Sequence, residues 1–281
     1  MKRLNIALFF FLVTYIPQTF ASIGMKLDVP YSTQPDNPRN LLDIFYPEDV
    51  SSAKEVLIFI HGGSWDSGKK EMYRWLGKNM AKRNVVSVII NYRLSPEVQF
   101  EKIAGDCALS VKWVKENISD FGGNSDRIFV MGHSAGAHLA ALINNDPRFF
   151  KEQGIPNPIR GVILNDGFGL DMFEYLNVAK TDKRTRSFLQ TFSEDKEVWK
   201  QGSPGYYLDQ VNNPYLILVG EKTYPVIKLQ ADRFFQNLNS LNKMAEYELI
   251  PKRRHKGMII QMIMARNRMY DVIISFMRKY A

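Results

Sequence analysis

A serine between two glycines is the strongest chemical signal in this sequence. Ser134 lies in the run Gly132-His133-Ser134-Ala135-Gly136, directly after an apolar strand pattern at 128–131 and before an apolar helical pattern at 137–142. A turn from strand to helix strains the serine backbone and needs glycines where a Cβ would collide with neighbouring backbone. The hydroxyl then lies beside a helix N-terminus, which favours developing negative charge. This setting predicts that Ser134 is a nucleophile and not part of an ordinary turn.

A second glycine-rich turn can supply hydrogen-bond donors to the same chemistry. His61-Gly62-Gly63-Ser64-Trp65 follows the apolar strand pattern at 56–60. Acyl transfer needs N–H groups aimed at the carbonyl oxygen as it becomes negative, and a glycine pair lets bare backbone approach closely. We therefore expect an oxyanion hole formed by Gly62, Gly63 and Ala135.

The general base has four histidine candidates. His61, His133 and His138 lie inside or next to the two motifs, where packing or loop fixing is the expected role, with the His133 side chain directed away from the serine. His255 alone follows the last strand pattern, at 247–250, so the order along the chain is serine, acid, histidine. We predict His255 as the base. Its basic neighbours, Lys252, Arg253, Arg254 and Lys256, could draw anionic esters towards it or simply form a solvated loop.

The acid that orients the base is less clearly marked. It should lie just after the strand pattern at 215–219, where Glu221 is the only carboxylate in the turn. Asp232 lies further along, in a helical pattern, where it would face the wrong way or lie too far from the base. Asp166, at the end of the preceding strand pattern, is the alternative to Glu221.

These motifs lie between alternating strand and helix patterns. Apolar runs predict strands near 41–46, 56–60, 85–90, 128–131, 162–164, 215–219 and 247–250, and three- and four-residue spacing predicts helices near 100–118 and 226–241. This alternation predicts an α/β fold with a mostly parallel sheet covered by helices on both faces. The long interruption at about 168–213 is expected to cap the carboxyl ends of the strands, where such sheets bind ligands.

Composition fits one globular domain: 45% of the 281 residues are hydrophobic and 23% are charged. Residues 1–21 run from Lys2 and Arg3 through an apolar stretch to Ala21, which predicts a signal peptide and an exported protein, periplasmic or secreted. The apolar stretch is too short for a membrane anchor. Cleavage would remove two cations and lower the formal charge from +8 to +6. Cys107 is the single cysteine, so no intramolecular disulfide can form.

Taken together, these residues resemble the α/β-hydrolase superfamily. From 41 to 142, and again around 216–255, the chain is similar to its esterase/lipase group, in particular carboxylesterases and kynurenine formamidase-like or prenylcysteine methylesterase-like hydrolases. The resemblance rests on the two glycine motifs and on Asn91-Tyr92-Arg93-Leu94, Asp106, Trp113, Phe121-Gly122-Gly123 and Ala137-His138-Leu139. It implies that the acid lies three residues after Gly220, where this chain has Thr223.

Two functions from different classes follow. The first is a serine carboxylic ester hydrolase that forms an acyl-enzyme on Ser134, with a small-molecule ester as substrate, short acyl groups favoured, and no metal or organic cofactor. An aryl formamidase-type amidase is a variant of this reading. The second is a hydrolase-fold binding protein with impaired turnover, which Thr223 at the usual aspartate position suggests. No nucleic acid partner and no integral membrane segment after signal cleavage are expected, and the sequence does not define the oligomeric state.

Overall fold

The computed structural model describes residues 22–32, 37–49 and 51–281. The segment 1–21, on which the signal peptide prediction rests, lies outside these residues. The described strands are β1 (Ile23–Pro30), β2 (Leu41–Pro47), β3 (Lys54–Ile60), β4 (Val86–Ile90), β5 (Gly123–His133), β6 (Ile159–Asn165), β7 (Tyr215–Gly220) and β8 (Ala245–Ile250). The described α-helices are α1 (Arg74–Ala81), α2 (Phe100–Asn117), α3 (Ala135–Asn145), α4 (Arg148–Glu152), α5 (Met172–Val178), α6 (Lys183–Phe192), α7 (Lys196–Gln201), α8 (Pro225–Ser240), α9 (His255–Ile260) and α10 (Met269–Tyr280).

The strands form one mixed sheet in the order β1-β2-β4-β3-β5-β6-β7-β8. Only β2 is antiparallel to both of its neighbours, and β3 to β8 run parallel. The predicted mostly parallel sheet is therefore confirmed. The edge strand β1 was not predicted from the sequence, although Ile23, Met25, Leu27 and Val29 alternate with other residues at the two-residue period of a strand.

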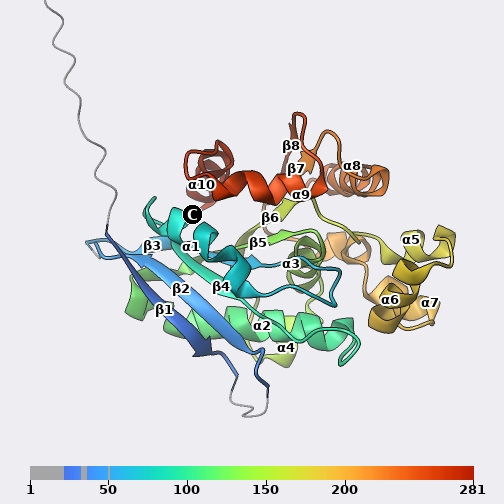
Figure 1. The fold of residues 1–281 in the computed structure, drawn as a ribbon, viewed down its shortest axis with the longest axis horizontal. Coiled ribbons are helices and arrows are strands. Elements are labelled where there is room, and N and C mark those ends of the chain that lie inside the picture. Colours follow the sequence, from blue (N-terminus) through green and yellow to red (C-terminus); the bar gives the residue numbers. More distant parts are fainter. Residues whose placement is uncertain (1–21, 33–36, 50) are drawn as a thin grey trace, which may run out of the picture.

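Helices cover both faces of the sheet (Figure 1). On one face, α2, α3 and α8 pack on side chains such as Ile58, Val130 and Ile217. On the other face, α1, α9 and α10 pack on the alternate residues of the same strands, such as Phe59, Met131 and Leu218. Strands buried on both faces read as continuous apolar runs, which is why the sequence marked them so clearly.

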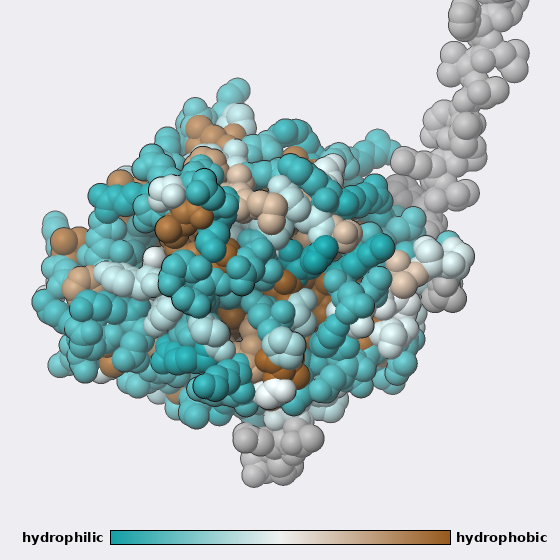
Figure 2. Space-filling model, turned by 180° about the vertical axis from the view of Figure 1, so that it is seen from behind, coloured by the Kyte–Doolittle hydropathy of each residue, from teal (hydrophilic) through white to brown (hydrophobic). Residues whose placement is uncertain are grey.

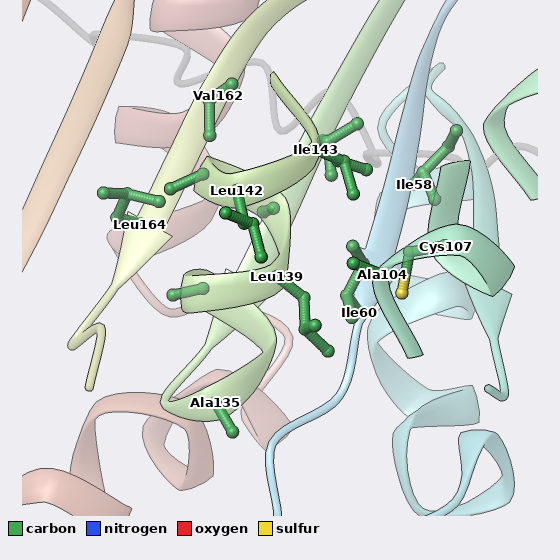
Figure 3. Packing of buried hydrophobic residues seen from close by; sticks show 14 of the residues in the cluster. Ile58, Ile60, Ala104, Cys107, Ala135, Leu139, Leu142, Ile143, Val162 and Leu164 are labelled. Carbon is green, nitrogen blue, oxygen red and sulfur yellow. The ribbon is translucent and has the colours of Figure 1, made fainter. Parts of the chain in front are cut away.

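Helix α3 shows how tightly one of these layers is filled. Figure 3 shows Leu139, Leu142 and Ile143 of α3 between strands β3 and β6, with Cys107 of α2 on one side. Every residue of α3 is buried, so this helix is held on all sides. Each fully buried Leu or Ile side chain contributes about 1.5–3 kcal/mol of transfer free energy, which fixes the N-terminus of α3 where Ser134 meets it.

The chain between β6 and β7 forms α5, α6, α7 and a 3₁₀ segment, Pro204–Gln210. These three α-helices gather at one end of the molecule (Figure 1). They coincide with the 168–213 interruption recognised in the sequence. In the view of Figure 2, most of the surface is hydrophilic and the hydrophobic residues form separate patches.

Candidate active site

The sheet register brings the ends of β5 and β6 side by side. His133, the last residue of β5, pairs with Asn165, the last residue of β6. The next residue of each chain segment, Ser134 and Asp166, therefore leaves the sheet at the same level. Both have positive φ, 57° and 53° respectively, so both lie in sharp turns that ordinary residues seldom adopt.

The two glycines around Ser134 are required by close backbone contacts. A Cβ on Gly132 would lie 2.1 Å from the carbonyl oxygen of Gly136, and a Cβ on Gly136 would lie 2.1 Å from that of Ile60. Ser134 lies between β5 and α3 and is only partly exposed. The strand, elbow and helix predicted from the sequence are all present.

His255 contacts Ser134 directly. Its Nε2 lies 2.9 Å from Ser134 Oγ. His255 is the first residue of helix α9, directly after the turn that follows β8. The ring of His133 stacks on that of His255 with centroids 4.9 Å apart, and His133 Nε2 lies 3.2 Å from the His255 carbonyl oxygen. His133 thus supports His255 and is not directed away from the site as expected, although its predicted role in fixing the loop holds.

The structure corrects the expected partner of His255. Its Nδ1 lies 2.6 Å from Asp166 Oδ2, and the Asp166 side chain is fully buried. Glu221, favoured from the sequence, is exposed, and its Oε2 accepts a hydrogen bond from the Lys252 backbone N–H at 2.6 Å. Glu221 therefore ties the turn after β7 to the turn after β8. The physical reason is direction: the Glu221 side chain turns away towards the neighbouring loop, whereas Asp166 turns back over the ends of β6 and β7.

Asp166 is held by the turn that carries Thr223. The Gly220 backbone N–H donates to Asp166 Oδ1 at 2.8 Å, and the Thr223 hydroxyl donates to Asp166 Oδ2, the oxygen that also faces His255. Sequence reasoning missed this role of Thr223 and treated the residue only as a departure from a family pattern. Asp232, judged too distant, accepts instead from the Tyr247 hydroxyl at 2.5 Å.

The turn after β3 leaves backbone donors near Ser134. Gly62 approaches so closely that a Cβ there would lie 2.7 Å from the His133 carbonyl oxygen and 3.1 Å from Ser134 Cβ. Gly63 has φ 130°, which favours glycine. Among the residues that the structure describes, no hydrogen bond engages the backbone N–H of Gly63 or Ala135.

The remaining histidines are structural. His61 stacks on Tyr92 with centroids 4.3 Å apart, and its Nδ1–H donates to the Gly62 carbonyl at 2.9 Å. His138 accepts from the Trp65 indole N–H at Nδ1 and donates from Nε2 to the Gly202 carbonyl at 2.6 Å. Burial lowers the pKa of His61, His133 and His138 to about 4 in each case, so all three are neutral near pH 7.

Trp65 joins the glycine turn to the helices between β6 and β7. Its fully buried indole lies edge-on to Phe188 and Phe192 of α6, with centroids 5.4 and 4.9 Å away, and also contacts His138. Phe168 packs on the same indole at 6.0 Å and donates its backbone N–H to the Ser134 carbonyl at 3.2 Å. Helix α6 is therefore anchored to the glycine turn through Trp65 and to the Ser134 elbow through Phe168.

Phe168 and Tyr175 of the segment between β6 and β7 contact each other and Phe188. Phe173 and Tyr206 form a separate pair, and the Tyr207 hydroxyl donates to the Gln201 carbonyl. Over the described ranges, no cluster of three or more His, Cys, Asp or Glu side chains could hold a metal ion. None of the helices in the described part of the chain has the length and apolar character needed to cross a membrane.

A mostly parallel sheet with a serine elbow after β5 and a histidine after the last strand is the α/β-hydrolase fold. The chain belongs to the BD-FAE family, whose model matches residues 42–238. It thus lies in the esterase group of that superfamily, as its motifs indicated.

Named relatives agree with this placement. The chain is 28% identical over 240 residues to the probable isoprenylcysteine alpha-carbonyl methylesterase ICMEL1 of Arabidopsis thaliana, covering 80% of this chain and 50% of that protein. It is 30% identical over 241 residues to esterase LipQ of Mycobacterium tuberculosis, covering 81% of this chain and 56% of that protein. The chain thus spans little more than half the length of these relatives. Esterase B of Lactobacillus rhamnosis has a similar fold, with a TM-score of 0.77 and 18% identity over 92% of this chain and 85% of that one.

Proposed function

We propose that this protein is a serine esterase that hydrolyses carboxylic esters through an acyl-enzyme on Ser134. The observation that carries the proposal is the continuous contact from Ser134 Oγ to His255 Nε2 and from His255 Nδ1 to Asp166 Oδ2. In this arrangement Nδ1–H donates to the Asp166 carboxylate, which leaves Nε2 unprotonated and able to accept the serine proton.

The reaction proceeds in two halves. Ser134 Oγ attacks the ester carbonyl carbon while its proton passes to His255 Nε2, and the carbonyl oxygen becomes negative. The N–H groups of Gly62, Gly63 and Ala135 stabilise that charge. The carbon–oxygen bond to the alcohol then breaks, and the His255 proton passes to the departing alkoxide. In the second half, water gives a proton to His255 and attacks the acyl-enzyme, which releases the acid and restores the Ser134 hydroxyl.

Asp166 removes the main reason for reading the chain as an impaired binding protein. That reading rested on Thr223 at the position where relatives are expected to carry the acid. A fully buried carboxylate already faces His255 Nδ1, so the triad does not need an aspartate at 223. An aryl formamidase-type amidase uses the same machinery and is separated from an esterase by its substrate alone.

The helices between β6 and β7 are the proposed cap, and they favour short acyl groups. Phe168, Phe188 and Trp65 lie buried against one another beside the Ser134 elbow, so bulky rings occupy the space that a long acyl chain would need. The proposal also includes export of the protein after cleavage near Ala21.

Labelling with a fluorophosphonate probe, together with turnover of p-nitrophenyl esters from acetyl to dodecanoyl, tests this function. Wild type should be labelled and should favour acetyl or butyryl esters, and Ser134→Ala should lose both labelling and turnover. Aryl formamides in the same panel separate the amidase variant. Absence of labelling and turnover in folded wild-type protein would overturn the proposal.

A further inference from the structure

An exposed arginine of α6 lies over the aromatic residues next to the proposed triad. The Arg184 guanidinium carbon lies 5.1 Å from the ring centroid of Phe168, 5.4 Å from that of Phe188 and 5.7 Å from that of Tyr224. Two of these aromatic residues contact the proposed triad residues. The Tyr224 ring lies 5.3 Å from that of His255, and the Phe168 backbone N–H donates to the Ser134 carbonyl. Arg184 is thus linked to His255 through the Tyr224 ring and to the Ser134 elbow through Phe168.

Stacking leaves the hydrogen-bonding edge of Arg184 available. A guanidinium uses its flat face for ring contacts, while its N–H groups point outward in the plane and match a carboxylate with two parallel hydrogen bonds. In the described part of the chain, no carboxylate lies within 4.0 Å of the Arg184 guanidinium. Asp182 interacts electrostatically with Arg184, but its carboxylate caps α6 by accepting from the Thr185 backbone N–H. The rings therefore hold Arg184 in place without neutralising it.

Arg184 borders an open hollow that begins at the oxyanion turn. The hollow has a volume of about 670 Å³, and its lining includes Ser64 and Asp66 of the turn after β3 and Lys183, Arg184, Arg186 and Phe188 of α6. Ser64 directly follows Gly62 and Gly63. The three cations outnumber the one acid, and Asp66 already accepts from the Ser187 hydroxyl at 2.8 Å. A group held in this hollow would therefore meet a net positive charge next to the turn that carries Gly62 and Gly63.

We propose that the substrate is an ester that also carries a carboxylate, and that Arg184 binds this carboxylate while the ester carbonyl lies at Ser134. This inference rests on the proposed esterase function and names its substrate class. Lys183 and Arg186 add to the attraction without stacking, so they contribute mainly through the field, which salt screens over about 10 Å at 0.1 M. Arg184, held on three rings, supplies the directional contact.

Matched esters of nearly equal size test the proposal. One pair varies the acyl side: the 4-nitrophenyl hemiester of succinate against 4-nitrophenyl methyl succinate. The other varies the alcohol side: 3-carboxyphenyl acetate against 3-(methoxycarbonyl)phenyl acetate. In wild type, kcat/KM should be at least about tenfold higher for the charged member of one pair, as expected for a charge-assisted contact of about 1.5 kcal/mol. The pair that shows the preference identifies the side of the ester that faces α6.

Arg184→Gln should abolish that preference and Arg184→Glu should reverse it, whereas Arg266→Gln, an exposed arginine before α10, should leave it intact. Calorimetry measures binding of the same four esters to Ser134→Ala, and this readout does not depend on turnover. If wild type turned over none of the four esters but Ser134→Ala still preferred to bind the charged members, the esterase function would be contradicted and the carboxylate assignment would stand. Equal kcat/KM and equal binding within both pairs, or a preference that survives in Arg184→Gln, would overturn the carboxylate assignment.

Discussion

Thr223 and His255 donate to the same oxygen of Asp166, Oδ2. The acid of the proposed triad therefore lies after β6, while the turn after β7 contributes a hydroxyl and a backbone N–H that hold it. The family resemblance had placed the acid in that turn itself, at the position of Thr223. In this chain the end of β6 thus supplies the carboxylate, and the turn after β7 supplies the groups that orient it.

Asp166→Asn should lower kcat by about a thousandfold or more, because an amide cannot hold the His255 tautomer or stabilise the imidazolium. Glu221→Gln should leave kcat unchanged, since Glu221 contacts the Lys252 backbone and not His255. Steady-state kinetics on p-nitrophenyl acetate, with circular dichroism to verify folding, measures both. A large loss in Glu221→Gln with full activity in Asp166→Asn would contradict the triad described above.

Thr223→Val should lower kcat by about tenfold, which corresponds to loss of a hydrogen bond of about 1.5 kcal/mol to a charged group. Thr223→Ser keeps the hydroxyl and should restore most of the rate. The combination Thr223→Asp with Asp166→Asn should be faster than Asp166→Asn alone, because it returns a carboxylate to the turn after β7. If Thr223 had a purely structural role, Thr223→Val would change the unfolding free energy but not kcat at saturating substrate. Thr223→Ser and Thr223→Val would then have the same kcat.

The free energy of unfolding should fall as pH decreases from about 6.5 towards 4. His61, His133 and His138 have pKa values of about 4 in the folded protein, below the value of about 6.5 expected in the unfolded chain. Between these values the unfolded chain binds more protons, so stability is fully present above pH 6.5 and is lost on acidification. The slope should approach about 1.4 kcal/mol per pH unit for each histidine.

Urea unfolding at pH 7.0, 6.0 and 5.0 measures this slope above the range in which most carboxylates titrate. His138→Gln should reduce the slope by about one third even if it lowers stability at every pH, because it removes one of three such groups. Stability that stays constant from pH 7 to pH 5 would contradict the neutral, buried state of these histidines.

Gly63→Ala should lower kcat by about a hundredfold through displacement of an oxyanion donor. Its φ of 130° and a Cβ position only 2.3 Å from the Ser67 carbonyl oxygen force the turn to move. Gly105→Ala on α2 is the matched control, because a Cβ there meets nothing within 4 Å. Equal kcat in the two variants would show that the turn after β3 plays no part in stabilising the transition state.

The fold could be predicted from the sequence because its inner strands are buried on both faces and its helices are amphipathic. The Ser134 elbow, His255 and the Gly62-Gly63 turn were also readable, since each depends on residue type and on position directly after a strand. The acid was harder to assign because two carboxylates follow neighbouring strands. Which of them faces His255 depends on the direction in which each turn leaves the sheet. Asp166 has a φ of 53° and is held by Gly220 and Thr223, and no residue pattern reports either feature.

Other features escaped for related reasons. Strand β1 has the alternation of a strand, but it follows the apolar stretch that suggests a signal peptide and lacks the continuous apolar run of the inner strands. Thr223 suggested loss of the catalytic acid, because a hydroxyl cannot replace a carboxylate. Its contribution appears only once Asp166 lies beside it in space.

The Trp65 contacts limit how the insertion between β6 and β7 can be exchanged among relatives. Its indole packs between the glycine turn and α6, and its N–H donates a hydrogen bond to His138 of α3. A scaffold without an aromatic side chain at the position of Trp65 would leave Phe188 and Phe192 of a transplanted 168–213 segment without their packing partner. A scaffold that receives this segment therefore needs the equivalents of Trp65 and His138.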